Sequence, residues 1–135
     1  MNLFRILVTC AVLALPATAL ADITRVGRVN VNVSPASGSV ITVLAPANNV
    51  GGAIIRNANM NVAGGQIVLI VSPTTPTGIK DGTILLMAAS ANTSTDGTAV
   101  LPREAYVPPG YGIYGLASTS VSVNSTIWVN FDVQQ

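Results

Sequence analysis

The clearest alternation of apolar and polar residues lies near the end of the chain, in the segment Thr126–Val133. A period of two residues is typical of a β-strand that has one side on a hydrophobic core. We therefore expect one set of side chains to face the interior, namely Ile127, Val129, Phe131 and Val133. The alternate set is expected to face outward, namely Trp128, Asn130 and Asp132.

Other short segments rich in Val and Ile recur along the chain, and residues that favour turns separate them. They predict strands at 28–33, 40–44, 53–55, 66–71 and 83–88, and a strand, a Pro-Pro-Gly turn and a second strand within 106–114. Turns or loops are expected at 61–65, 72–82 and 90–97. The segment 66–71 is an apolar run from Ile67 onward, which is typical of a central strand. No amphipathic helix is predicted after residue 21.

Many short strands separated by Gly, Pro and Asn turns predict an all-β fold of the sandwich class. We expect a single β-sandwich domain over residues 22–135, with a jelly-roll or related Greek-key topology. An immunoglobulin-like sandwich is the alternative, although the chain lacks the Cys-Trp-Cys pattern of that fold.

Residues 1–21 have the pattern of an export signal that forms an apolar helix. Arg5 lies in a short N-terminal segment, an apolar run from Ile6 to Leu15 follows, and Ala19-Leu20-Ala21 provides small residues at the expected cleavage position. This pattern predicts a secretory signal peptide, or an uncleaved membrane anchor if the segment is retained.

The chain after the predicted signal carries little charge and no net charge. Removal of residues 1–21 takes away Arg5 and leaves five basic residues against five acidic ones. Without a basic patch, nucleic acid is not expected as a partner. A neutral surface rich in Asn, Ser and Thr has little self-repulsion, so we expect the protein to associate with copies of itself.

The residue types on which most catalytic and metal sites depend are missing. The chain has no histidine, and its single cysteine, Cys10, lies in the predicted signal. We therefore expect no catalytic residues, metal or cofactor, and no enzymatic activity. A carboxylate pair remains conceivable, but Asp81 and Asp96 precede glycines in predicted loops, and Glu104 is expected to pair with Arg103 at the surface.

The segment 106–133 resembles the end of small jelly-roll modules in phage fibre, spike and decoration proteins. The resemblance rests on the order Val-Pro-Pro-Gly-Tyr-Gly-Ile-Tyr, a Ser/Thr-rich turn, Val-Ser-Val and a final strand that contains Trp128. It implies a trimeric virion component that binds a capsid or a host surface. The predicted signal departs from this pattern, because most phage virion proteins assemble in the cytoplasm; a membrane-containing virion would retain the segment as an anchor.

The aromatic residues of this last segment are the candidate interaction surface. Tyr106, Tyr111, Tyr114 and Trp128 could stack on sugar rings or form the centre of a protein interface. The competing interpretation is that these rings cover the core or the ends of the sandwich.

These observations predict a non-enzymatic, exported structural or assembly protein, at a cell surface, in a fibre or in a virion. The alternative is a module that binds a glycan or a host surface through aromatic residues near Trp128. The first strand, within 24–33, is expected to belong to its own sandwich or to pair with the sheet edge of a neighbouring subunit. A membrane is expected as a partner only if residues 1–21 are retained.

Overall fold

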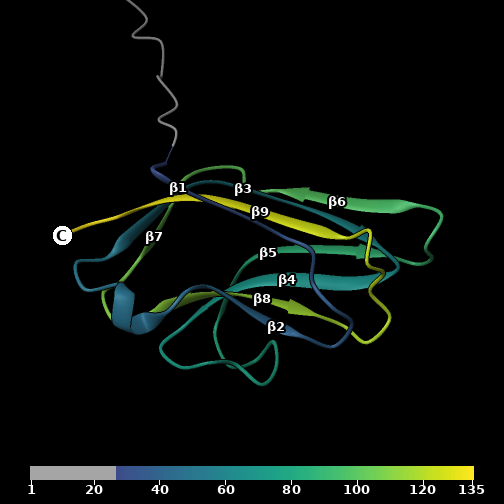
Figure 1. Cartoon of the computed structure of the whole chain (residues 1–135), viewed down its shortest axis with the longest axis horizontal. Helices are drawn as coiled ribbons and strands as arrows, with labels where there is room; N and C mark the ends of the chain where they lie inside the picture. The colour runs from purple at the N-terminus through teal and green to yellow at the C-terminus, as the bar shows by residue number, and fades with distance from the viewer. Residues whose placement is uncertain (1–26) are drawn as a thin grey trace, which may run out of the picture.

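A computed structural model describes residues 27–135, which form nine β-strands and one short 3-10 helix (Figure 1). The strands are β1 (Val29–Val33), β2 (Val40–Leu44), β3 (Ala53–Ala63), β4 (Gly65–Ser72), β5 (Thr83–Ser90), β6 (Asp96–Val100), β7 (Ala105–Val107), β8 (Gly112–Ala117) and β9 (Thr126–Val133), with the 3-10 helix η1 at Pro46–Asn48. The predicted helix and cleavage position at 1–21 lie outside the described residues.

The strands form two sheets that pack face to face, and every strand pair is antiparallel. Sheet A has the order β1-β9-β3-β6, and β7 pairs with the other end of β3. Sheet B has the order β2-β8-β4-β5. The prediction of an all-β sandwich is thus confirmed.

The core lies between the sheets and is built from the inward side chains of both. In β9, Ile127, Val129 and Phe131 are buried while Trp128 is exposed, so the predicted alternation is confirmed. Ile67 and Leu69 of β4 face them as members of the same buried cluster. Because the interior contains large branched and aromatic side chains, it stabilises the fold without a disulfide.

β3 is much longer than predicted, and β6 was not predicted as a strand. β3 continues to Ala63, although only 53–55 were predicted as a strand, and β6 begins at Asp96 within a segment expected to be a loop. The second half of β3 alternates Asn with Ala, Met and Val, and Asn disfavours strands on average. Burial of Ala58, Met60 and Val62 outweighs that preference. The tight turn is confined to Gly64 and Gly65, which have φ angles of 69° and 74°.

One buried asparagine holds the Pro-Pro-Gly turn between β7 and β8. The Asn49 amide nitrogen donates to the carbonyl oxygens of Pro108 and Tyr111, at 2.7 and 2.8 Å. The backbone nitrogen of Gly110 donates in return to the Asn49 carbonyl at 2.8 Å. Asn49 is fully buried, so these hydrogen bonds fix the turn against the segment after η1.

The outward side of sheet B is apolar and is covered by the connection between β4 and β5, which lies below β2 and β8 in Figure 1. Its buried outward residues are Val68, Ile70, Tyr114 and Leu116, which we call the covered face. Asp81 organises the connection, because its carboxylate accepts hydrogen bonds from the backbone nitrogens of Thr77 and Gly78 and from the Thr77 hydroxyl.

Candidate functional site

The outward side of sheet A carries asparagines in two rows that cross three strands. The register places Asn30, Asn130 and Asn57 in one row. The next row contains Asn32, Trp128 and Asn59. Asn61 lies in the row beyond, opposite Thr126. We call this surface the amide face; it comprises Asn30, Asn32, Asn57, Asn59, Asn61, Asn130 and Trp128.

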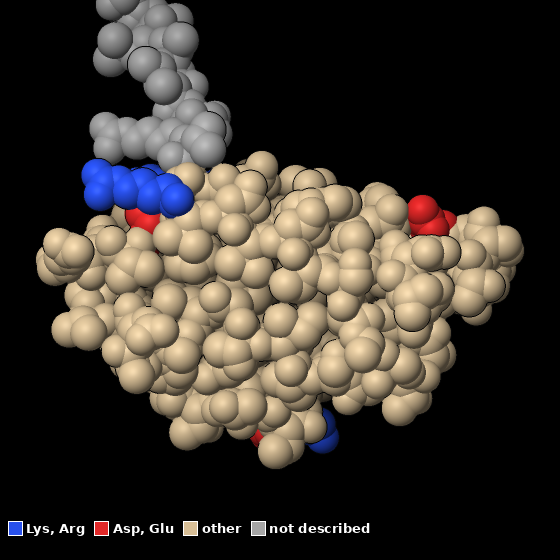
Figure 2. All heavy atoms as spheres, viewed as in Figure 1, with Lys and Arg blue, Asp and Glu red and all other residues tan. Residues whose placement is uncertain are grey.

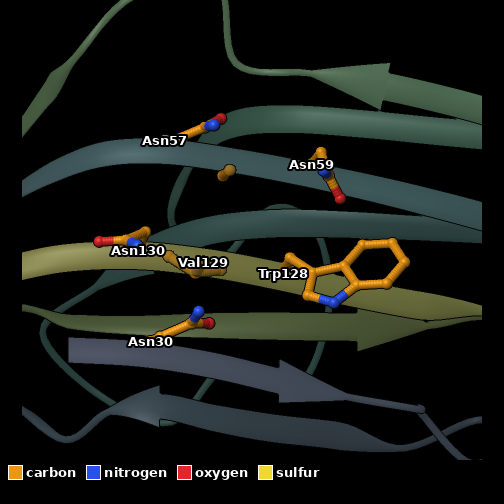
Figure 3. A pocket seen from close by; sticks show the side chains of 7 residues that line it. Asn30, Asn57, Asn59, Trp128, Val129 and Asn130 are labelled. Atoms are coloured by element: carbon orange, nitrogen blue, oxygen red, sulfur yellow. The ribbon is translucent and has the colours of Figure 1, made fainter. Parts of the chain in front are cut away.

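A shallow hollow of about 270 Å³ lies at the centre of the amide face. Four asparagines, Trp128 and the backbone regions of Ala58 and Val129 line it; the asparagines are Asn30, Asn57, Asn59 and Asn130. In Figure 3 the indole ring lies along the sheet with its broad side turned toward the viewer, and the labelled amides lie above it and to its left. The Trp128 side chain thus offers a ring face, although the residue as a whole is only 36% exposed.

Some amide groups of this hollow have no hydrogen-bond partner among the described residues. Among the described residues, the side-chain oxygens of Asn59 and Asn130 are buried and accept no hydrogen bond. The register bulges between Ile55 and Asn57, which turns both Arg56 and Asn57 outward. The amide face therefore combines a partly exposed apolar ring with amide groups whose hydrogen-bonding capacity is not filled within the described part of the protein.

Charged residues gather at one end of the amide face. The Arg56 guanidinium pairs with Glu104 at 2.8 Å and with Asp132 at 2.9 Å. The backbone N–H of Arg28 donates to the other Asp132 oxygen at 2.8 Å. That hydrogen bond, followed by the one from Arg56, lowers the pKa of Asp132. The predicted Glu104–Arg103 pair was wrong: Glu104 pairs with Arg56, from a strand distant in sequence.

The three predicted tyrosines do not join Trp128 in one cluster. Tyr114 is 1% exposed and belongs to the covered face, so in this fold it is not part of an exposed surface. Tyr111 lies in the turn held by Asn49, and it is partly exposed. Tyr106 is 58% exposed on sheet A, but it lies opposite Ile54 at the end of β3, away from the hollow.

The described residues contain no group of three or more Asp or Glu side chains that could hold a metal ion. The Asp81 carboxylate accepts hydrogen bonds within the β4–β5 connection. These hydrogen bonds, chiefly the one from the Thr77 hydroxyl, lower the pKa of Asp81. Asp96 accepts a hydrogen bond from Asn61 at 3.1 Å. Within residues 27–135, Glu104 and Asp132 are brought together through Arg56, which binds both. None of the helices in residues 27–135 is long and apolar enough to cross a membrane.

The rest of the surface carries few charges. Figure 2 shows acidic and basic side chains only in small groups at the rim of the view, with uncharged residues between them. Broad parts of this side therefore lack the charge that keeps protein copies apart.

Comparison with known proteins identifies no relative: neither a family model nor a curated protein matches this chain.

The asparagines of the hollow were not among the predicted site residues. The signal that could have found them is the alternation of Asn with apolar residues at 30–32 and 57–61, which places amides on one side of a strand. It remained ambiguous because Asn clusters also mark turns.

Proposed function

We propose that this protein is a non-enzymatic, exported structural subunit that associates with copies of itself, at a cell surface, in a fibre or in a virion. The observation that carries the proposal is a cysteine-free sandwich whose long, uncharged sheet edge lies next to exposed apolar side chains.

The sheet edge formed by β5 is suited to pairing with another subunit. β5 is the last strand of sheet B, and its eight residues include no charged residue and no proline. Ile84 and Met87 on this strand are 45% and 53% exposed. Natural proteins usually protect such an edge with charge, proline or a covering segment, because unpaired backbone groups attract another strand. In sheet A, β1 is also an edge strand. The predicted alternative, in which the first strand pairs with the sheet edge of a neighbouring subunit, requires such a position.

The strand order supports assignment of the sandwich to the jelly-roll class. When β7 is set aside, the first strand pairs with the last, the second with the second-last, and so on inward to the β4–β5 pair. Such nested pairing is what results when one long antiparallel hairpin wraps around a core into two four-stranded sheets. In the immunoglobulin order the first strand pairs with the second, which is not observed here. Jelly rolls occur in capsid and lectin domains, in keeping with the resemblance of residues 106–133 to phage virion modules.

The proposed lack of enzymatic activity is supported by the state of the carboxylates. A glycosidase pair needs one carboxyl group that is protonated and able to donate. Arg56 binds both Glu104 and Asp132, and the pKa of Asp132 is lowered. Both carboxylates thus bind the Arg56 guanidinium, and Asp132 in particular is stabilised in its charged form.

The test of this proposal is the native mass of the full protein, measured by light scattering across a range of concentrations, together with the intact mass of the chain. We expect an oligomer whose chain begins at Asp22 after export. Met87→Lys should dissociate it by placing a charge beside the β5 edge, whereas Val123→Lys, at an 80% exposed loop position, should not. A wild-type protein that stays monomeric at high concentration would overturn the proposal.

The second candidate is a module that binds a glycan or a host surface. One observation favours it: the single tryptophan of the chain lies in a hollow lined by amides and no charged residue. Such a surface suits a ligand with apolar patches and hydroxyl groups.

A further inference from the structure

We propose that the hollow of the amide face binds one ring of a neutral sugar, with Trp128 under the ring and the surrounding asparagines bound to its hydroxyl groups. The inference rests on the second candidate function and specifies its ligand class and contacts.

The shape of the hollow sets the size of the ligand. Ligand pockets in proteins typically begin at about 300 Å³, and the hollow has about 270 Å³. A space of this size accommodates a single six-membered sugar ring and leaves the rest of a longer glycan outside. Because the indole ring lies along the sheet (Figure 3), its face can carry the C–H groups of one side of the sugar.

The hydrogen-bonding groups match hydroxyls better than they match charged groups. An amide side chain both donates and accepts, as a hydroxyl does, whereas a carboxylate ligand needs donors alone. Asn30 approaches from β1, Asn130 from β9, and Asn57 and Asn59 from β3, so amides are available on both sides of the indole. The unpartnered oxygens of Asn59 and Asn130 can be presented if the amide turns about its last side-chain bond.

Electrostatics favours an uncharged ligand. No charged residue lines the hollow. The nearest charged group is the cluster of Arg56, Glu104 and Asp132 beside the first row, in which Arg56 already binds two carboxylates. With Arg28, this end has two basic and two acidic residues, so its charges balance. An anionic sugar would lose hydration without gaining a cation.

The chain provides its own probe, because its single tryptophan lies in the hollow. A single-ring ligand is expected to bind with a Kd of about 1 mM. We would titrate the full protein with methyl glucoside, methyl galactoside, methyl mannoside and N-acetylglucosamine to about 10 mM, and follow Trp128 fluorescence. Glucuronate and sialic acid serve as anionic probes.

Variants localise the binding. Trp128→Ala should weaken sugar binding at least tenfold, measured by saturation-transfer NMR because the fluorophore is lost, and Trp128→Phe should retain part of it. Asn130→Ala should weaken binding severalfold through lost hydrogen bonds. The matched control is Tyr106→Ala, an exposed aromatic residue on the same sheet outside the hollow, which should bind as the wild type does.

The results of these experiments distinguish failure of this inference from failure of the glycan-binding function on which it rests. A fluorescence change with a neutral sugar that is lost in Trp128→Ala and kept in Tyr106→Ala supports it. If only anionic sugars bind at Trp128, the proposal of a neutral sugar ligand is wrong, but the glycan-binding function is supported. If no sugar binds and Trp128→Ala lowers the native mass, the amide face is a subunit interface, and both the inference and the glycan function fail.

Discussion

The two outward surfaces of the sandwich differ although both are built by the same alternation of side chains. In sheet B the outward residues are mainly apolar, and the β4–β5 connection buries Val68, Ile70 and Tyr114 beneath it. In sheet A the outward residues are mainly asparagines, no connection crosses the hollow, and Trp128 remains partly exposed. The apolar outward surface is therefore the one that a connection covers, and the amide-rich outward surface is the one left open.

This difference explains why β4 contains an uninterrupted apolar run, Ile67 to Val71, whereas β9 alternates. A strand covered on both sides has no position that requires a polar residue. Ile67 and Leu69 face the core between the sheets, while Val68 and Ile70 face the connection. The prediction that 66–71 is a central strand holds because sheet B is covered on both sides.

The largest effect is expected from removing the main side chain of the covered face. Tyr114→Ala should lower the free energy of unfolding by about 3–5 kcal/mol, because a large buried ring is replaced by a cavity. Urea denaturation measures this value. The control is Tyr106→Ala, which should change stability by no more than about 0.5 kcal/mol because Tyr106 is exposed. Equal effects for both tyrosines would contradict the description of the covered face.

The cover itself is tested by Asp81→Ala. Loss of the hydrogen bonds to Thr77 and Gly78 should loosen the connection, and the fluorescence of a dye that binds exposed apolar surface should rise. Thr75→Ala, at an exposed position of the same connection, is the control.

Acid should have a similar effect on the wild-type protein. The pKa of Asp81 is lowered from 3.8 in the folded state, so its stabilising contribution is present above that value and is lost as the pH falls through the lower folded pKa. We expect dye binding to rise below about pH 3.8 in the wild type. In Asp81→Ala, dye binding should already be high at neutral pH and change less on acidification.

A smaller effect is expected at the centre of the amide face. Trp128→Ala should lower the free energy of unfolding by about 1–2 kcal/mol, less than Tyr114→Ala, because part of the ring already contacts water. The same urea experiment measures it. A loss as large as that of Tyr114→Ala would show that Trp128 is mainly a packing residue.

The smallest effect is expected when the amide face is made to resemble the covered face. Asn59→Val should raise the free energy of unfolding by up to about 1 kcal/mol, because it removes a buried amide oxygen without a partner and adds a side chain that favours strands. Without a cover, the new apolar surface should increase self-association in light scattering. Reduced stability with an unchanged native mass would contradict this expectation.

The sequence predicted the elements better than it predicted the surfaces. The strands at 28–33 and 40–44, to within one residue, and the alternation within 126–133 were correct because period-two patterns are local. β6 was missed because its five residues, in the sequence Asp-Gly-Thr-Ala-Val, begin with a pair typical of turns. Its strand conformation depends on pairing with β3, residues 59–63.

The amino-acid sequence by itself determined the all-β class, the sparse charge, the missing histidine and the direction of the last strand's side chains, since each depends on composition or on neighbouring residues. Only the tertiary structure decided that Tyr114 is covered while Trp128 is open, that Arg56 pairs with Glu104 and Asp132, and that asparagines from three strands meet around one indole. The physical reason is the same in each case. Strand register and the path of a connection bring together residues that are far apart in the chain, and no local pattern records which of them will meet.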